Sequence, residues 1–235
     1  MKSKALKFSL IIPVYNESRY IRPLLRSIRA SSEQPSEIIF CDNNSTDDTR
    51  IQIQKHKHRL PISILTEKQK GILPTVERLW KHAARDLIGK IDADCILPKH
   101  WIRNAIRHFN GSPNLDACTG PIVSSDGNMF IRTAVSVGYI VGVPVFFTLK
   151  GDMPVYGPNG VFRKTTLKKI QGYAWHTNDL DDHIISRKLT QHHCKVSWYP
   201  DMYMFHSTRR FQQRPMAALE AVLSLFRSDY YNERQ

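Results

Sequence analysis

Two aspartates one residue apart, Asp92 and Asp94, follow a short apolar stretch in the segment KIDADCILP. Carboxylate oxygens are the ligands that Mg²⁺ and Mn²⁺ prefer, and such an ion usually binds substrate phosphates as well. Asp is also common in turns, so a turn is the alternative interpretation of the pair. The position after an apolar strand favours the metal, and the pair predicts a site for Mg²⁺ or Mn²⁺.

Two further polar clusters, Tyr-Asn-Glu at 15–17 and Asp-Asn-Asn at 42–44, also follow apolar runs. In open α/β sheets, ligands bind beyond the carboxyl ends of the strands. We therefore expect both clusters to meet Asp92 and Asp94 in one crevice. An exposed carboxylate at Asp42 would suit an N–H donor on a nucleotide base, and an Asx turn at the same residue is compatible with that role.

Alternating strands and helices would position these clusters. Apolar runs predict four strands and helical spacing predicts the helices between them: strands at 7–15, 36–42, 61–67 and 88–92, and helices at 18–30, 45–58 and 74–87. This rhythm predicts a mostly parallel open sheet of Rossmann-like βα units that is flanked by helices.

The second half of the chain is less regular. Its patterns predict helices, short strands and a basic loop: helices at 98–109, 179–193 and 215–227, a turn, strand and helix within 156–173, a strand at 195–200 and the loop at 207–214. We find no internal repeat and no linker. The chain is therefore predicted to form one continuous domain, residues 1–235, with two lobes.

The charge and the apolar content of the chain limit which partners and which cellular location it can have. Thirty-four Lys and Arg against 21 Asp and Glu give a formal net charge of +13, which favours anionic partners. Cys41, Cys95, Cys118 and Cys194 form no CxxC pair, which is typical of reduced, buried thiols in a cytoplasmic protein. The chain start does not resemble a signal peptide, and the uncharged stretch 133–149 is short for a spanning helix, so we expect that stretch to be buried or interfacial.

The motifs together resemble the family 2 glycosyltransferases, which have the GT-A fold. SLIIPVYNE and DNNSTDDT resemble the ends of the family's first two strands, and DADC resembles its Asp-x-Asp metal motif. GPNGVFRKTTLKKIQGY is similar to the acceptor-side segment, DLDDHIISRKL to the Glu-Asp helix start, and YPDMYMFHSTRRF to the segment after that helix. The resemblance extends from about residue 7 to about residue 211. It implies a nucleotide-binding half, 1–97, and an acceptor-binding half, 98–235, with a smaller mixed sheet.

The same resemblance implies a set of site residues. The nucleotide-binding residues would be Pro13, Tyr15, Glu17, Asp42, Lys70, Asp92, Arg209 and Arg210. Asp94 would be the main protein ligand of the cation, with Asp92 and His206 as further ligands. Solvated side chains are the alternative for the basic residues of this set, and a structural role is the alternative for His206.

The resemblance also implies a catalytic base at the start of the helix predicted for 179–193. In the family, the second acid of this pair takes a proton from the acceptor hydroxyl, which assigns the role to Asp182 with Asp181 as its rival. The family usually has Glu before Asp, whereas this chain has Asp-Asp. Because negative charge stabilises a helix N-terminus, plain capping is the alternative for either residue.

The predicted activity is therefore transfer of one sugar, with inversion, from a nucleotide-diphosphate donor to an acceptor hydroxyl. The resemblance favours a UDP-sugar and a saccharide or lipid-linked acceptor, in the synthesis of cell-surface polysaccharide, lipopolysaccharide or glycolipid. The Gln-x-x-Arg-Trp motif of processive synthases is absent from RRFQQRPM, which favours a single addition. The positive charge suggests peripheral contact between a cytoplasmic enzyme and the anionic inner membrane surface.

Two other functions remain as alternatives. A nucleotidyltransferase can share the α/β fold, but it would usually carry a glycine-rich loop after the first strand, and PVYNESRY has no glycine. A basic nucleic-acid-binding protein would fit the charge, but the basic residues form no patch that is interleaved with aromatic residues. We therefore expect no nucleic-acid partner.

Overall fold

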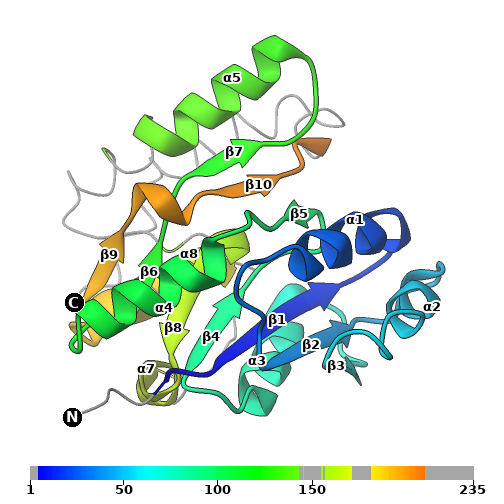
Figure 1. Ribbon diagram of the computed structural model, residues 1–235, viewed down its shortest axis with the longest axis horizontal. Coiled ribbons are helices and arrows are strands. Elements are labelled where there is room, and N and C mark those ends of the chain that lie inside the picture. Colours follow the sequence, from blue (N-terminus) through cyan, green and yellow to red (C-terminus); the bar gives the residue numbers. More distant parts are fainter. Residues whose placement is uncertain (1–4, 143–144, 146–154, 156, 171–180, 210–235) are drawn as a thin grey trace.

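A seven-stranded sheet lies at the centre of the computed structural model, which describes residues 5–142, 145, 155, 157–170 and 181–209 (Figure 1). In the order of the sheet its strands are β3 (Ile62–Thr66), β2 (Glu37–Asp42), β1 (Phe8–Val14), β4 (Leu87–Lys90), β8 (Gly160–Arg163), β6 (Ala117–Thr119) and β9 (Val196–Trp198). Neighbouring strands are parallel except at β8, which runs antiparallel to both β4 and β6. The predicted mostly parallel sheet is confirmed.

Helices cover both faces of this sheet. The described helices are α1 (Ser18–Arg29), α2 (Thr49–Gln54), α3 (Ile72–His82), α4 (Trp101–Gly111), α5 (Met129–Val137), α7 (Lys164–Ile170) and α8 (Asp181–Gln191). Successive residues of β1 point to opposite faces, so Leu10 packs in the core beneath α1 and α4, whereas Ile11 packs in the core beneath α3 and α8. This arrangement leaves the strand ends at the edge of the sheet to form a site.

A smaller sheet of three strands stands beside the large one, as expected for the second lobe (Figure 1). It contains β5 (Cys95–Ile96), β10 (Met204–His206) and β7 (Ile122–Ser124). Because β10 is antiparallel to β5 and parallel to β7, the sheet is mixed. It joins a segment that follows β4 to a segment more than one hundred residues later in the chain.

The helix predicted for 45–58 is much shorter than expected. Its first residues instead form a loop, in which the Ser45 amide donates to Asp42 and the Thr46 amide donates to Asn16. The helix therefore begins at Thr49, with Asp48 at the N-cap position. It ends at Gln54, and the following residues 55–59 form a turn.

The helix predicted for 74–87 is displaced toward the N-terminus. It spans α3 (Ile72–His82), and Leu87 is already the first residue of β4. The segment between them is extended because its amides are engaged elsewhere: Ala84 donates to Glu37 and Arg85 donates to Ser9. The helix predicted for 98–109 is likewise shifted, to α4 (Trp101–Gly111).

The uncharged stretch 133–149 is described only as far as Gly142 and at Val145. It continues α5 into a π-helical turn, Gly138–Gly142. Of the two expectations for this stretch, burial is wrong for Val137, Val141 and Val145, each of which is more than half exposed (53%, 54% and 52%), and the interfacial position stays a prediction. Within the described part of the chain, no helix has the length and apolar content to span a membrane.

Three of the four cysteines, Cys41, Cys95 and Cys118, are buried and all four are unbridged, as predicted. The predicted turn, strand and helix within 156–173 correspond to the short helix Gly157–Asn159, β8 and α7. The other short helix, Pro200–Met202, precedes β10. The helix predicted for 215–227 and the loop beyond Arg209 lie outside the described residues.

Candidate active site

The polar clusters that follow β1 and β2 lie side by side at one edge of the large sheet. The Asn16 amide donates to Ser45 Oγ at 3.0 Å, and the Glu17 amide donates to Thr49 Oγ1 at 2.7 Å. Because β1 also pairs in parallel with β4, the carboxylates that follow β4 reach the same edge. The expected convergence of three strand ends is therefore present.

Asp92 and Asp94 lie in a tight turn between β4 and β5, closed by a bond from the Cys95 amide to the Asp92 carbonyl (3.2 Å). The Asp94 side chain is only 5% exposed, whereas that of Asp92 is 26% exposed. The antiparallel register sets His206 directly opposite Cys95. His206 Nε2 consequently lies 3.3 Å from Asp94 Oδ1 and 3.9 Å from Asp92 Oδ2.

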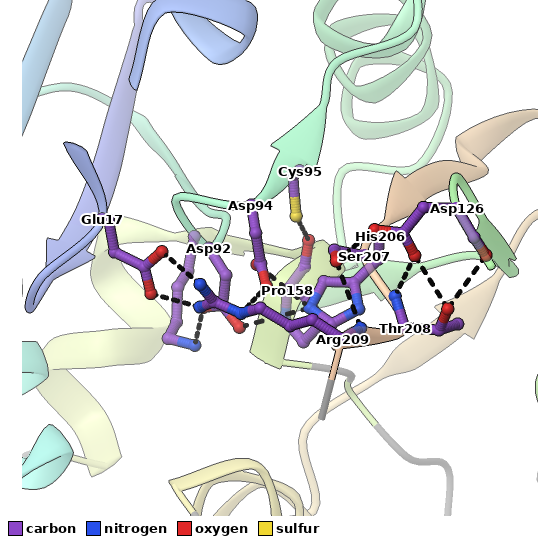
Figure 2. A network of polar contacts seen from close by, with 11 residues as sticks. Glu17, Asp92, Asp94, Cys95, Asp126, Pro158, His206, Ser207, Thr208 and Arg209 are labelled. Carbon is purple, nitrogen blue, oxygen red and sulfur yellow. Dashed lines mark hydrogen bonds and ion pairs between the residues drawn. The ribbon is translucent and has the colours of Figure 1, made fainter. Parts of the chain in front are cut away.

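Arg209 connects this turn to the end of β1 (Figure 2). Its guanidinium forms a two-pronged ion pair with Glu17, in which Nη1 donates to Oε2 at 2.7 Å, and its Nε lies 3.2 Å from Asp94 Oδ2. Burial raises the pKa of Glu17, an effect that the bond from Arg209 only partly offsets. Burial lowers the pKa of Arg209, but the bond to Glu17 and the charge of Asp94 more than compensate, so Arg209 stays positive.

Lys90 lies beneath Asp92, in a position that the sequence analysis did not single out. It is the last residue of β4 and its side chain is only 2% exposed, yet its Nζ lies 3.3 Å from Asp92 Oδ1. A buried ammonium requires a partner, and the neighbouring carboxylate supplies one. The only signal in the sequence was a lysine inside an otherwise apolar strand.

Asp126 anchors the segment that carries His206 and Arg209, and it too was missed. It lies in the loop between β7 and α5, and its carboxylate accepts from Ser207 Oγ, from the Thr208 amide (2.6 Å) and from Thr208 Oγ1 (2.7 Å) (Figure 2). Burial raises the pKa of Asp126, but these bonds together lower it by more, so the pKa is below its usual value. The Asp-Gly turn within GPIVSSDGN was the available signal.

The residues expected around the nucleotide differ in exposure. Tyr15 is 54% exposed and offers its ring at the end of β1, whereas Pro13 is buried within that strand. Asp42 was expected to be exposed, and this is wrong: only 6% of the residue is exposed, because its carboxylate turns inward and accepts from the Ser45 amide at 3.2 Å. This bond comes from the amide three residues on, one residue beyond that of the Asx turn considered for Asp42, so Asp42 closes a wider turn.

The loop that contains Lys70 is held against the end of β2. The Asn43 side chain donates to the carbonyls of Glu67 and Gln69 and accepts from the Gly71 amide at 2.9 Å. Gly71 has φ +130°, a conformation that side chains rarely adopt. Lys70 is exposed beside this anchor.

Comparison with known proteins gives this site a family. Residues 9–193 match the family described as Glycosyl transferase family 2. The chain belongs to glycosyl transferase family 2.

Individual members of the family are distant relatives. The chain is 24% identical over 216 residues to the poly(ribitol-phosphate) beta-N-acetylglucosaminyltransferase TarS of Staphylococcus aureus strain MW2, an alignment that covers 87% of this chain and 36% of TarS. The chain thus spans about a third of the length of this relative.

Two solved structures share the fold. S. aureus TarS 1–349 in complex with UDP-GlcNAc matches with a TM-score of 0.68 and 18% identity, over 86% of this chain and 59% of that chain. The mannosyltransferase PcManGT from Pyrobaculum calidifontis, in complex with GDP-Man and Mn²⁺, matches with a TM-score of 0.66 and 18% identity, over 87% and 58%. These similarities confirm the predicted GT-A fold.

The donor set of this family 2 chain fits a divalent cation. Asp94, Asp92 and His206 offer carboxylate oxygens and one imidazole nitrogen, a combination that suits Mn²⁺ and, through its oxygens, Mg²⁺. Cys95 Sγ also falls within the cluster of potential ligands, whose atoms lie within 4.8 Å of one another. However, its thiol donates to the Pro158 carbonyl at 3.8 Å, and burial raises its pKa well above the usual value. Because Mg²⁺ and Mn²⁺ prefer oxygen ligands to a thiol, the two carboxylates and His206 fit such an ion better than Cys95 does.

The side chains of three predicted site residues lie outside the described part of the structure. Asp181 and Asp182 begin α8, as the sequence predicted, but their side chains lie outside the described part of the structure. Arg210 lies outside the described residues altogether. Their roles therefore stay predictions.

Proposed function

We propose that this protein is a metal-dependent inverting glycosyltransferase, which moves one sugar from a nucleotide-diphosphate donor to an acceptor hydroxyl. The observation that carries the proposal is the meeting of Asp92, Asp94, His206 and Arg209 at the carboxyl edge of a parallel sheet. Family membership favours this reaction over nucleotidyl transfer and over nucleic-acid binding.

The donor would lie across the ends of β1 and β2. The exposed ring of Tyr15 and the end of β1 at Pro13 would contact the base or ribose, and Asp42 would receive a base N–H with the carboxylate oxygen that is not engaged by Ser45. Lys70, Arg209 and Arg210 would approach the diphosphate, since a guanidinium fork matches phosphate oxygens. We favour UDP, and the UDP-GlcNAc complex of TarS supports that choice.

Asp94, with Asp92 and His206, would hold Mg²⁺ or Mn²⁺ when the donor binds. The ion would supply positive charge for the departing diphosphate. Glu17 would contribute indirectly, because its ion pair fixes the guanidinium of Arg209 beside Asp94. Neutralising the leaving group in a partly buried site is worth more than the same contact in water.

The transfer itself would need one base and no covalent enzyme intermediate. Asp182 would remove the acceptor proton, with Asp181 as the alternative, while the acceptor oxygen attacks the anomeric carbon from the side opposite the diphosphate. The acceptor would be a saccharide or lipid-linked saccharide of a cell-surface polysaccharide, lipopolysaccharide or glycolipid. The poly(ribitol-phosphate) transferase among its relatives supports that class.

Calorimetric titration of UDP, GDP, dTDP and ADP, each with and without Mn²⁺, tests the donor site. We expect one nucleotide, UDP, to bind in a Mn²⁺-dependent manner and Asp94→Ala to abolish that binding. Glu33→Gln, which removes an exposed carboxylate beyond the end of α1, is the matched control and should bind like the wild type. Binding that depends on neither Mn²⁺ nor Asp94 would refute the proposal. Tighter binding of GDP than of UDP would show that the donor is a GDP-sugar.

A further inference from the structure

The outer surface of α1 carries a row of arginines that the site does not use. Arg19, Arg22, Arg26 and Arg29 are all exposed, and α1 contains no acidic residue. Their spacing of three, four and three residues places them on one face of the helix. At a rise of 1.5 Å per residue, the row extends over roughly 15 Å.

A second basic segment lies next to this row. The turn after α2 has the sequence KHKHR, in which Lys55, Lys57 and Arg59 are exposed. Between the two segments lies His56: burial lowers its pKa, and so do the charges of Arg59 and His58 from the turn and of Arg29 and Arg22 from α1. Cations of both segments therefore surround a common point.

We call these seven residues the basic face: Arg19, Arg22, Arg26, Arg29, Lys55, Lys57 and Arg59. Within the described residues, none of them forms an ion pair with a carboxylate, whereas Arg78, Arg85, Arg107 and Arg209 elsewhere on the molecule all do. The basic face is thus a concentration of uncompensated charge.

Folding stability does not explain this arrangement. Like charges three or four residues apart on a helix repel one another, and Arg19 lies at the helix end where the backbone dipole disfavours a cation. Arg26 and Arg29 lie in the last turn, where the dipole favours a cation, but this gain does not account for Arg19 or Arg22 at the other end of the row.

We propose that the basic face docks the protein on the surface of an anionic phospholipid bilayer. Arginine suits lipid phosphates because its guanidinium is permanently charged and pairs with phosphate in two-pronged geometry. Exposed cations on a helix and an adjacent turn can reach headgroups of a planar surface together. Ile51 of α2, which is 51% exposed and precedes the basic turn, adds an apolar side chain that can enter the headgroup region.

A nucleic acid fits this surface less well. Binding of single strands usually adds aromatic side chains on which bases stack. The one aromatic residue of α1 is Tyr20, and its ring already lies under Arg209, whose guanidinium carbon is 4.6 Å from the ring centroid. The basic face thus offers charge without a stacking platform, which favours lipid headgroups.

The docking surface goes beyond the proposed transfer reaction and does not depend on it, although the two are adjacent in the chain. α1 begins at Ser18, directly after Glu17 of the candidate active site. A bilayer that contacts α1 would therefore lie within reach of the site mouth. Vesicle binding can be measured without donor or acceptor, so the two proposals fail independently.

Cosedimentation with phosphatidylcholine vesicles, with and without phosphatidylglycerol, tests the docking surface. We expect binding only to the anionic vesicles and progressive release as salt is raised. Because one basic residue contributes about fivefold to partitioning, Arg22→Gln/Arg26→Gln should weaken binding roughly thirtyfold. The same variant should unfold in urea within about 0.5 kcal/mol of the wild type, since the loss of like-charge repulsion offsets the loss of the favourable charge of Arg26 in the last turn.

Lys168→Gln/Lys195→Gln removes the same charge from exposed positions on α7 and before β9, far along the sheet from α1, and should bind like the wild type. An equal loss in this control would overturn the proposal, because net charge rather than the basic face would then determine binding. A loss in Val137→Ser/Val141→Ser without one in the arginine variant would also overturn it, in favour of α5. Tighter binding to single-stranded RNA than to vesicles would reassign the surface to nucleic acid.

Discussion

The two halves of the molecule contribute different side chains to the same site. Residues up to 97 supply the carboxylates Glu17, Asp92 and Asp94, each directly after a strand of the parallel sheet or within the turn that follows it. Residues beyond 97 supply the imidazole of His206, the last residue of a strand of only three residues, and the guanidinium of Arg209 three residues later. The carboxylates would repel one another without cations: Lys90 of the first half pairs with Asp92, and Arg209 of the second half pairs with Glu17 and Asp94.

The two halves also differ in what positions their side chains. The carboxylates are placed by βα units that are contiguous in sequence, whereas His206 and Arg209 are placed by contacts across long separations. Asp126 binds residues 81 and 82 positions later, and Glu17 pairs with Arg209 over 192 positions. The first half is thus expected to tolerate local change, and the second half is expected to depend on a few distant contacts.

The largest effect should come from the second half, at the start of α8. Asp182→Asn should lower kcat by about 10² to 10⁴, because general-base catalysis typically contributes that much. Asp181→Asn is the matched variant and should change kcat by less than about tenfold, since its role would be electrostatic. Initial rates with saturating donor and acceptor distinguish the two residues. A larger loss of kcat in Asp181→Asn would assign the base to Asp181 instead. If neither variant lost activity, the base would not lie at the start of α8.

The anchor at Asp126 should give the next largest effect. Asp126→Ala removes an acceptor that serves Ser207 and Thr208, which should lower the free energy of unfolding by about 3 kcal/mol. It should also raise KM for the donor more than it lowers kcat, because Arg209 would lose its position. Asp126→Asn keeps one side-chain oxygen and should recover part of both. A variant that is destabilised but keeps a normal KM would show that Asp126 serves the fold alone.

The third prediction concerns Lys90, which pairs with Asp92 within the first half of the chain. Lys90→Met leaves Asp92 beside an apolar side chain and should lower the free energy of unfolding by about 2 kcal/mol, less than for a fully buried pair because Asp92 is partly exposed. A double-mutant cycle with Asp92→Asn isolates the pair, and a coupling of about 1 kcal/mol is expected. Urea denaturation measures each corner. Additive effects would mean that Lys90 does not position Asp92.

The comparison also separates what the sequence could predict from what it could not. Apolar runs predicted β1 to β4 and the carboxylates at their ends, because parallel strands and their polar ends are local patterns. The boundaries of α2 were wrong, since the amides of Ser45 and Thr46 bond to side chains outside the helix. No local pattern reveals that Asp126 faces Ser207, because this contact depends on the register of β7 and β10.

The assignment of His206 and Arg209 to the site came from a family resemblance rather than from periodicity. The pairing of β5 with β10 explains why His206 reaches Asp94, and strands of two and three residues are too short to be predicted from hydrophobic alternation. The carboxylates of the candidate site are thus placed by local sequence patterns, whereas His206 and Arg209 are placed by strand pairing between distant segments. Only the carboxylates could be predicted from the residue types.

The smallest expected effect lies within the first half, at Asp47, which connects α1 to α2. Its carboxylate accepts from the amides of Ser18 (3.1 Å) and Thr49 (3.0 Å) and from the Thr49 hydroxyl. Burial raises the pKa of Asp47, but these bonds together outweigh burial and lower the pKa to about 2. Since the folded pKa is below the usual value near 3.9, the stabilisation is present above about pH 4 and is lost as the pH falls toward 2.

Asp47→Asn should therefore lower the free energy of unfolding by about 1 kcal/mol at pH 7, the usual contribution of a capping side chain. The difference from the wild type should shrink as the pH falls and be mostly lost near pH 2, where about half of the wild-type carboxylate is protonated. Urea denaturation of both proteins between pH 7 and pH 2 measures this. Asp48→Asn is the neighbouring control, because Asp48 makes no capping bond with its side chain. A difference that persists unchanged at pH 2 would attribute the effect to the shape of the side chain rather than to its charge, and the connection between α1 and α2 would then not depend on ionisation.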